Sequence, residues 1–533
     1  MRRLPLLVAL VPFTAPLSAA RAQTAPDEGT LVIAVAREAE SPVPTLWQND
    51  GANRELSDLL FLRLADLGPD VSLTNEASYQ PRLARHWERR DSLTLVFDLD
   101  PRARWQDGAP VTAADVIFAF DRARDPVLTP QLAPLLERIE SVRAEGDSRV
   151  VFRFRQAYPE QMYDATFQVP PLPAHLLRGI RPESLATSRF IQQPVGDGPY
   201  RFLRRVPGQS VELAANDGFF LGRPRIRRVL FLLAGDPEAR VNLLLSGQAD
   251  AVDNIYALPN FARLEHLPAF QYHPVPGLFL AYVTMNLRDP ADTSRPHPIL
   301  ADPVVRRALV VALDRRAIAH AAYGEFVQTP SAPVSTLLSR AVDAPPPIPV
   351  DTALARRLLA SRGWLDHDHD GVLDKDGRPL QLSLLVPAVV NSRRLMAEQI
   401  QEAYRRLGIT LKVDLLDANV YLERRDAGQF DLEFYGVGQD PSPTGLVQSW
   451  SCAGMGAANV GHYCDPAVDS LIRIAALARA DAAARWGVVL RRIADDYPAI
   501  FMAATVTLAA VHHRFEHVVI SPLSTWSEVW RWS

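Results

Sequence analysis

The chain has 533 residues, of which 48% are hydrophobic and 22% are charged, and its formal net charge at pH 7 is −4. This composition is typical of a globular protein, and the length predicts two or three compact units rather than one. The mild negative charge argues against nucleic acid or an anionic membrane as a partner.

The first 22 residues have the layout of a secretory signal peptide. Arg2 and Arg3 precede an apolar stretch from Leu4 to Leu17, and Ala20-Arg21-Ala22 offers a small-residue cleavage site. The apolar stretch is too short and too interrupted by proline for a spanning helix. No cysteine follows it, so a lipid anchor is not indicated. We therefore expect an exported protein.

The next part of the chain carries three strand patterns. Residues 31–36 are almost wholly apolar, which predicts a buried strand. Residues 93–99 alternate apolar side chains with polar or small ones, as a half-buried strand does, and residues 148–158 predict a matching strand.

A turn and a helix lie between those last two strands, in "WQDGAPVTAADVIFAFDRARD". Asp107 and Gly108 predict the turn, Thr112 is a good N-cap, and Asp115 stands three residues on as a weaker capping-box acid. We expect strand, helix and strand to share one sheet, and this stretch to be structural rather than a binding site.

The second half begins with "FQYHPVPGLFLAYVTMNLRDP", where a proline-rich loop changes into an apolar strand. We expect this segment to cross between two lobes. Helical spacing follows at residues 302–324, 352–364 and 392–409, and strand patterns follow the last two at residues 380–386 and 410–416. Such alternation favours an α/β lobe.

An acidic turn, Asp366 to Gly377, partly copies a calcium-binding loop. Asp366, Asp368, Asp370 and Gly371 match positions 1, 3, 5 and 6, but Gly377 stands where a bidentate Glu is needed. A weak ion site and a solvated turn both stay open. We assign no metal ligands and no cofactor.

The two cysteines, Cys452 and Cys464, have eleven residues between them. In an exported protein they favour a disulfide, with two buried thiols as the alternative. His513 and His517 are four apart in a strand-like stretch, too far apart for one metal ion without local bending.

The sequence contains no G-x-S-x-G, H-E-x-x-H or P-loop motif. Carboxylate pairs are abundant, but none stands in a context that indicates a tuned acid and base. We therefore expect no enzyme, and keep a secreted hydrolase with a cleft between α/β lobes as the alternative function.

Six segments, taken in order, resemble the bacterial extracellular solute-binding proteins of family 5, the periplasmic components of ABC importers for peptides, nickel and related solutes. They are "WQDGAPVTAADVIFAFDRARD", "VGDGPYRF", "LLLSGQADAV", "VTMNLRDPAD…ADPVVRRALVVALDRRAIA", "GWLDHDHDGVLDKDGRPLQLSLL" and "VGHYCDPAVDSLI".

The resemblance implies an α/β, two-lobed periplasmic-binding-protein fold of the class II or cluster C type, with a hinge between the lobes and an inserted α/β subdomain. The implied parts are residues 1–22 as signal peptide, 23–47 with 186–276 and 505–533 as the first lobe, 48–185 as its inserted subdomain, and 277–504 as the second lobe.

It also implies a monomer in the periplasm that buries a small solute between its lobes and delivers it to an inner-membrane permease. The solute would be a peptide, an amino-acid derivative or a metal chelate. In the peptide-binding members an aspartate accepts the ammonium group of the peptide, and Val437 stands at that position here. Asp440, Glu433 or Glu40 could replace it, or the ligand could lack a free amino terminus.

Candidate ligand-binding residues rest on position. Glu40 and Trp47 follow the first strand, where such proteins present ligand loops. The others follow the hinge strand or lie in the second lobe: Asn286, Tyr435, Asp440 and Trp450.

Overall fold

The computed structural model describes residues 29–39, 41, 43, 51–68, 70–125, 128–129, 132–253, 255, 263–264, 267–455, 458–479 and 481–533. The predicted signal peptide, Glu40 and Trp47 lie outside these residues. None of the helices in the described part is both long enough and apolar enough to cross a membrane.

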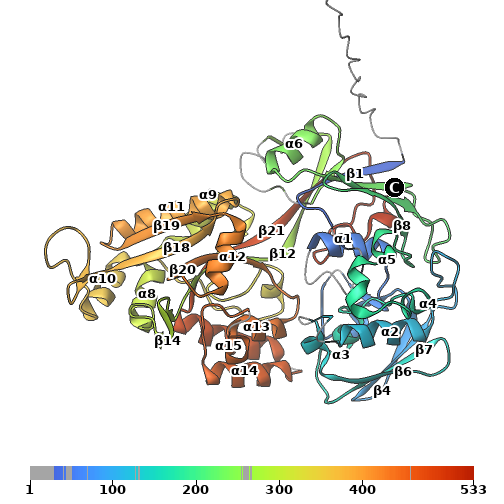
Figure 1. Ribbon diagram of the computed structural model, residues 1–533, viewed down its shortest axis with the longest axis horizontal. Helices are drawn as coiled ribbons and strands as arrows, with labels where there is room; N and C mark the ends of the chain where they lie inside the picture. The colour runs from blue at the N-terminus through green and yellow to red at the C-terminus, as the bar shows by residue number, and fades with distance from the viewer. Residues whose placement is uncertain are drawn as a thin grey trace, which may run out of the picture.

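One mixed sheet runs through both halves of the molecule (Figure 1). Its strands are β1 (Thr30–Val35), β8 (Tyr200–Val206), β9 (Ser210–Ala215), β10 (Arg228–Leu233), β11 (Ala251–Val252), β12 (Phe270–Met285), β15 (Val327–Gln328), β18 (Gln381–Pro387), β19 (Thr410–Leu416), β20 (Leu432–Gly438) and β21 (Ala499–His512). Their order is β19-β18-β20-β12-β21-β11-β1-β10-β9-β8, and β15 pairs with β21.

The long antiparallel strands β12 and β21 connect the two halves (Figure 1). Their pairing runs from Phe270–His512 to Thr284–Ala499, with a register shift between Pro276 and Leu280. Gly277 lies at this shift, and a Cβ there would stand 2.7 Å from the Thr505 carbonyl oxygen. The strands β12 and β21 therefore approach each other so closely at this point that position 277 requires glycine.

The apolar core divides at the same place. Two clusters combine residues 31–270 with residues 508–532, and two others are built from residues 280–504. The molecule is therefore two-lobed, as the sequence predicts, with β12 and β21 as the connections. The finer boundaries predicted for the lobes and the inserted subdomain stay a prediction.

The first lobe carries a separate four-stranded sheet (Figure 1), in the order β4-β5-β7-β6. Its strands are β4 (Ala84–Asp91), β5 (Thr94–Leu99), β6 (Ile139–Ala144) and β7 (Arg149–Phe154), and α2 (Ala113–Ala123) packs on them. The rings of Phe120 in α2 and Phe152 in β7 pack edge to face, with their centroids 5.0 Å apart. The predicted strand, helix and strand are confirmed.

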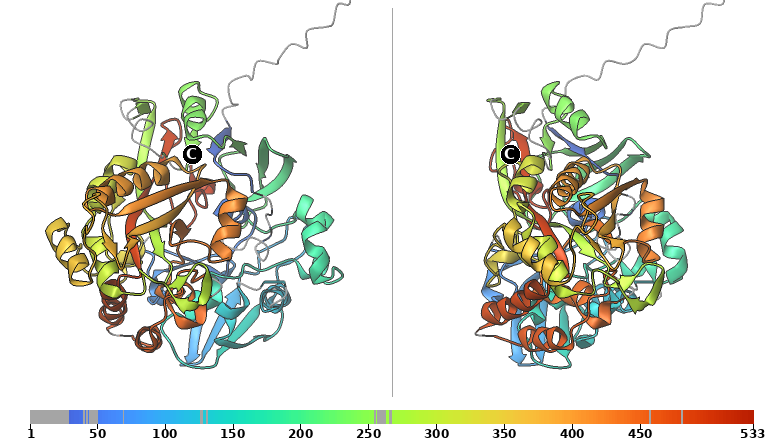
Figure 2. Two further views of the ribbon diagram at one scale, coloured as in Figure 1. Left: turned by 60° about the vertical axis from the view of Figure 1, so that its left-hand side comes forward. Right: turned by 90° about the vertical axis from the view of Figure 1, so that its left-hand side faces the viewer.

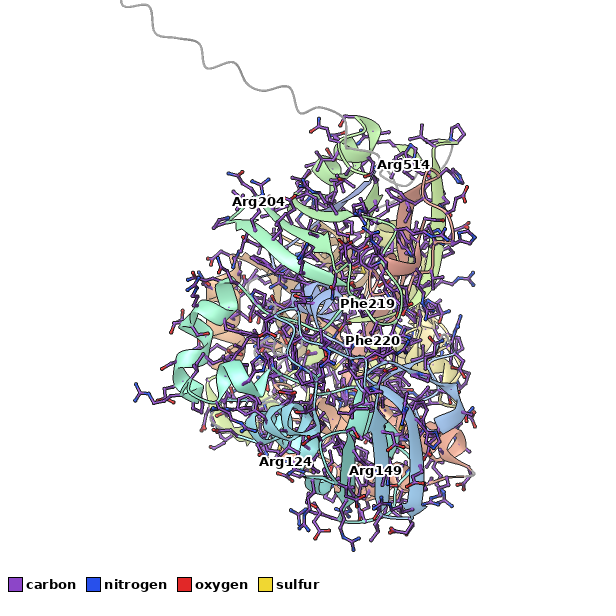
Figure 3. The ribbon with its side chains drawn as sticks, turned by 90° about the vertical axis from the view of Figure 1, so that its right-hand side faces the viewer. Arg124, Arg149, Arg204, Phe219, Phe220 and Arg514 are labelled. Atoms are coloured by element: carbon purple, nitrogen blue, oxygen red, sulfur yellow. A yellow bond between two sulfur atoms is a disulfide. The ribbon has the colours of Figure 1, made fainter. Side chains whose placement is uncertain are left out.

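A cation–π contact joins this subdomain to the rest of the first lobe, next to an aromatic contact within that lobe. Arg102, from the loop after β5, lies over the Phe220 ring at 5.7 Å, and Phe219 packs on Trp530 at 5.3 Å. Figure 3 shows Phe219 and Phe220 midway between Arg204 of β8 and Arg149 of β7. The subdomain and the lobe therefore share one packed core.

Helices flank the sheets in both lobes, and α8 to α15 belong to the second lobe (Figures 1 and 2). They are α1 (Gly51–Leu60), α3 (Gln161–Thr166), α4 (Ala174–Leu177), α5 (Arg189–Gln192), α6 (Pro237–Leu245), α8 (Pro303–Val311), α9 (Arg315–Tyr323), α10 (Thr352–Ser361), α11 (Asn391–Arg405), α12 (Ala418–Asp426), α13 (Leu446–Trp450), α14 (Pro466–Ala476) and α15 (Ala482–Asp496). The predicted helical stretch 302–324 forms two helices because Asp314 caps α9 through the Ala317 amide.

Short strand pairs complete the fold: β2 (Ala65–Leu67) with β3 (Tyr79–Pro81), β13 (Arg288–Asp289) with β14 (Asp292–Pro296), and β16 (Asp374–Lys375) with β17 (Arg378–Pro379).

The acidic turn includes β16, and its aspartates Asp366, Asp368 and Asp370 come before that strand. Candidate ligand atoms of Asp366, Asp368 and Asp370 lie within 4.8 Å of one another. The same carboxylates accept backbone N–H groups of the turn, Gly371 on Asp366 and Val372 on Asp370. These bonds are those of a solvated Asp/Gly turn, and the weak-ion alternative stays open.

Candidate ligand-binding cavity

A cavity of about 1230 Å³ lies between the two lobes. The first lobe contributes the segment after β1, the start of α1, residues of α3, parts of β9 and β10, and the C-terminal segment around Trp526. The second lobe contributes the last residues of β20, the segment that follows it, and α13. Residues 278–282 of the connecting strand β12 lie between these two walls.

The first-lobe wall brings distant segments together through a few specific contacts. The Glu55 carboxylate of α1 accepts the amides of Thr525 and Trp526, which ties the C-terminal segment to the cavity. Glu38, after β1, pairs with Arg205 of β8 and accepts the Gly208 amide at 2.8 Å. Of the segment that follows the first strand and is predicted to carry ligand loops, Arg37, Glu38 and Ala39 line the cavity.

The second-lobe wall is built on an aromatic cluster. Tyr282 of β12 lies 5.7 Å from Tyr435 and 5.5 Å from Trp450, measured between ring centroids. Trp450 is 6% exposed and also packs on Phe501, so one part of its ring supports the core while another lines the cavity.

The backbone of β20 also faces the cavity. Leu432 and Glu433 pair with β18, but residues 434–438 pair with β12 alone. Within the described part of the chain, no strand covers the opposite edge of β20 along Tyr435–Gly438, and these residues line the cavity. An extended ligand could therefore meet main-chain groups there.

Three of the predicted ligand residues, Tyr435, Asp440 and Trp450, line this cavity. Asn286 is not among the lining residues. Its buried amide donates to the carbonyls of Gly428 and Phe430 and accepts the Arg288 amide, so its side chain holds the second lobe together.

Val437 is in the cavity wall, and the acids considered as its replacements differ in position. Glu433 is buried outside the lining, where Tyr421 donates to it at 2.6 Å. Asp440 lines the cavity, but Tyr163 and Ser442 donate to its Oδ1 and Gln168 to its Oδ2. The structure therefore places the apolar Val437 in the cavity wall, and its match to the ammonium-binding aspartate stays a prediction.

Both signs of charge line the cavity. The acids are Glu38, Glu55, Asp164, Asp253 and Asp440, and the bases are Arg37, Arg54 and Arg138. Burial raises the pKa of Glu55 to about 7 and that of Asp164 to about 6. Burial also raises the pKa of Asp440. The cavity therefore carries less negative charge near pH 6 than its composition implies.

Several lining residues have no signal in the sequence. Tyr163, Gln168 and Arg138 lie between β5 and β8, and Trp526 lies near the C-terminus. None stands in a recognisable motif, since each reaches the cavity through long-range packing. Tyr163 is the one aromatic residue of α3, and core burial explains an aromatic side chain there equally well.

A disulfide joins Cys452 and Cys464 directly after α13. Ala453 and Gly454, next to the first cysteine, line the cavity. The Cys452 amide also donates to Asp469 of α14 at 3.1 Å. The crosslink therefore braces the segment that presents Trp450.

A family model described as the bacterial extracellular solute-binding proteins, family 5, matches residues 78–457. The chain belongs to this family. The oligopeptide-binding protein AppA of Bacillus subtilis (strain 168) is 26% identical over 397 residues, which cover 73% of this chain and 69% of AppA.

Solved structures of the family agree on the fold. AppA from Bacillus subtilis in complex with a nonapeptide has a TM-score of 0.79 at 22% identity, covering 94% of this chain and 98% of that one. NikZ from Campylobacter jejuni in complex with Ni(L-His) also has a TM-score of 0.79, at 23% identity, covering 95% and 100%. The family fold is thus shared along nearly the whole chain, and the cavity lies where its two lobes meet.

Proposed function

We propose that this family 5 protein is an exported, monomeric binding protein that captures a peptide or a similar polar solute between its lobes and delivers it to the permease of an ABC importer. It acts in the periplasm and carries out no chemistry on the solute. The lobes and subdomain have the boundaries expected from the sequence.

The cavity carries this proposal. Its volume, about 1230 Å³, exceeds the roughly 300–1,000 Å³ that encloses a drug-sized ligand. The uncovered edge of β20 along Tyr435–Gly438 adds main-chain donors and acceptors on one wall. An extended peptide satisfies such an edge by adding a strand, and aromatic side chains at either side accept its alternate residues.

The ligands of the relatives support the same classes of solute. AppA binds an oligopeptide and NikZ binds a nickel–histidine complex, so peptides and amino-acid chelates are the probes of choice. Val437 favours a solute whose recognition does not depend on a free amino terminus.

A hydrolase receives no comparable support. One constellation in the described residues has the side chains of a triad: Asp431 bonds His297 Nε2 at 3.0 Å and accepts the Ser383 hydroxyl at 2.8 Å. The acid stands in the middle, and His297 Nδ1 accepts the amides of Ile299 and Leu300. The histidine therefore has no nitrogen to activate the serine, and none of the three lines the cavity.

The test is to identify what the purified protein carries and what it binds. Mass spectrometry of the denatured protein should reveal a co-purified peptide, amino-acid derivative or chelate. After its removal, defined tri-, penta- and nonapeptides, acetylated or free at the amino terminus, and nickel–histidine are tested for thermal stabilisation that follows RT ln(1 + [L]/Kd).

Tyr435→Ala should reduce this ligand-induced shift. Tyr323→Ala, a tyrosine outside the cavity, is the matched control and should lower the melting temperature without changing the shift. The proposal fails if none of these probes stabilises the protein and nothing co-purifies, or if a probe is recovered cleaved.

A further inference from the structure

Hydrogen bonds between side chains join the two lobes beside the cavity. Ser442, in the second-lobe segment after β20, donates its hydroxyl to Glu160 Oε2 at 2.7 Å, and Thr444 donates to the same oxygen at 3.3 Å. Tyr163 of the first lobe donates to Asp440 Oδ1 at 2.9 Å, and Gln168 donates to Oδ2 at 3.4 Å.

We name this set the interlobe latch: Glu160, Tyr163, Gln168, Asp440, Ser442 and Thr444. Figure 1 shows α3 at the edge of the first lobe that faces α13. Five of the six line the cavity, whereas Glu160 lies behind the lining. Glu160 therefore contacts the partner lobe without touching the space that a solute would fill.

We propose that Glu160 is a positioning residue for lobe closure, which fixes the Ser442–Thr444 turn of the second lobe and couples the closed state to proton uptake. This inference rests on the proposed function, because closure around a solute is the step it regulates.

The latch is withdrawn from water in the closed structure. Glu160 is 6% exposed, Ser442 is 2% and the neighbouring Asp164 is 3%. A hydroxyl–carboxyl contact in such surroundings counts for more than it would at the surface, and an unpaired carboxylate there is costly.

Three carboxyl groups, Glu160, Asp164 and Asp440, share this site. The charged and titratable groups around them come from α1, β3 and the segments around α3, and they are Arg54, Tyr79, Arg138, Tyr158 and Tyr163. Glu76 in turn acts on Tyr79, and Asp440 is the titratable group from the second lobe. Arg138 stands 3.6 Å from Asp164 and stacks on Tyr158, and Tyr158 donates to Asp164 at 2.6 Å. The cations compensate Asp164 and Asp440 more directly than they compensate Glu160.

Burial, followed by the charge of Asp164, raises the pKa of Glu160 to about 7. Opening the lobes admits water and moves Asp440 away, which outweighs the loss of the Ser442 hydrogen bond that lowers the pKa of Glu160. This pKa therefore returns toward the ordinary value near 4.5. The closed state then binds more protons than the open state between about pH 5 and pH 7. Acidification across this window therefore favours closure, and alkaline pH favours opening.

Closure of the ligand-free protein is measured by energy transfer between dyes on cysteines introduced at Leu203 and Val389. These residues are 47% and 79% exposed and lie on opposite lobes. The native cysteines are joined in a disulfide, so the dyes attach at the introduced sites. The closed-to-open ratio of the wild type should fall as pH rises from 5.5 to 8, by up to about tenfold per unit for each proton released.

Glu160→Gln keeps an acceptor for Ser442 but cannot ionise, so it should close at neutral pH and show a shallower dependence on pH. Glu160→Ala and, from the other lobe, Ser442→Ala should both shift the equilibrium toward opening. Glu140→Gln, an exposed acid of the same subdomain, is the matched control and should match the wild type.

Circular dichroism verifies that each variant is folded. If Glu160→Ala does not fold, Ser442→Ala tests the same contact from the other lobe. The inference is overturned if Glu160→Gln titrates like the wild type, or if closure increases with pH. Closure is measured without ligand, so its result is independent of peptide binding. If closure depends on pH but the protein binds no peptide, the proposed function alone is overturned. Peptide binding with pH-independent closure overturns the latch alone.

Discussion

Asp115 illustrates how one side chain holds the conspicuous stretch at residues 105–125 together. Its Oδ2 accepts the amide and the hydroxyl of Thr112, at 2.8 and 3.1 Å, and the indole N–H of Trp105 at 3.3 Å. Its Oδ1 accepts the Ala174 amide, which begins α4, at 2.9 Å. The residue expected to be a minor capping acid therefore joins the turn, the cap and a second helix.

Thr112→Ala should lower the free energy of unfolding by about 1 kcal/mol, the usual cost of losing an N-cap side chain. Asp115→Ala should cost more, about 3 kcal/mol, because it leaves several buried donors unsatisfied. Urea unfolding of the two variants measures this, with affinity for a bound probe expected to be unchanged. Equal costs for the two variants, or a loss of affinity without a loss of stability, would contradict the structural assignment.

Val437 provides a test of ligand chemistry at the level of one side chain. Val437→Asp places a carboxylate in the cavity wall, so it should raise affinity for peptides with a free amino terminus at least about tenfold relative to their N-acetylated forms. Val437→Asn controls for size without charge. If the wild type already prefers the free form strongly, another acid such as Asp440 takes the ammonium group.

At the scale of elements, α13 and its disulfide connect stability to the cavity. The bond between Cys452 and Cys464 closes a loop at a sequence separation of 12, which the chain-entropy model values at about 3 kcal/mol. Replacing both cysteines by serine should lower the unfolding free energy by about this amount. It should also weaken ligand binding, because Trp450, Ala453 and Gly454 lose their brace. A variant with reduced stability but unchanged affinity would show that α13 is held by packing alone.

The elements that carry the family resemblance hold the fold and stay away from the cavity. In "VGDGPYRF", a Cβ on Gly196 would stand 1.9 Å from the Leu60 carbonyl oxygen, and Asp197 accepts the Leu62 amide. In "LLLSGQADAV", Asp250 accepts the Val32 amide and binds Arg514. Close approaches and buried charge pairs need specific residues at specific spacings, and for this reason the sequence could reveal the fold.

The residues of the cavity could be predicted less well than the fold, because long-range contacts place many of them there. Tyr435, Asp440 and Trp450 follow a strand and a turn with local signals, so their segment could be found. Tyr163 and Trp526 reach the cavity through contacts with residues hundreds of positions away, and no local pattern records that distance. Asn286 lies outside the lining, and its position in the sequence does not reveal that its amide is bonded to backbone carbonyls.

For the whole molecule, buried carboxyl groups set how stability depends on pH. Burial raises the pKa of Asp197 to about 8 and the pKa values of Glu55 and Glu433 to about 7. Asp197 is 1% exposed, and among the described residues its Oδ2 has no hydrogen-bond partner. These groups keep their protons in the folded chain at a pH where the unfolded chain has released them.

Stability should therefore be largest near pH 5 and should fall as pH rises toward 8, because the folded state binds more protons than the unfolded state across this window. Each retained proton contributes at most about 1.4 kcal/mol per pH unit. Denaturant unfolding at pH 5, 6.5 and 8 measures the slope. Asp197→Asn keeps the acceptor for the Leu62 amide and removes the ionisable group, so it should flatten the slope and raise stability at pH 8 relative to the wild type. A slope of the opposite sign, or one that this variant leaves unchanged, would mean that these carboxyl groups are ionised in the folded protein.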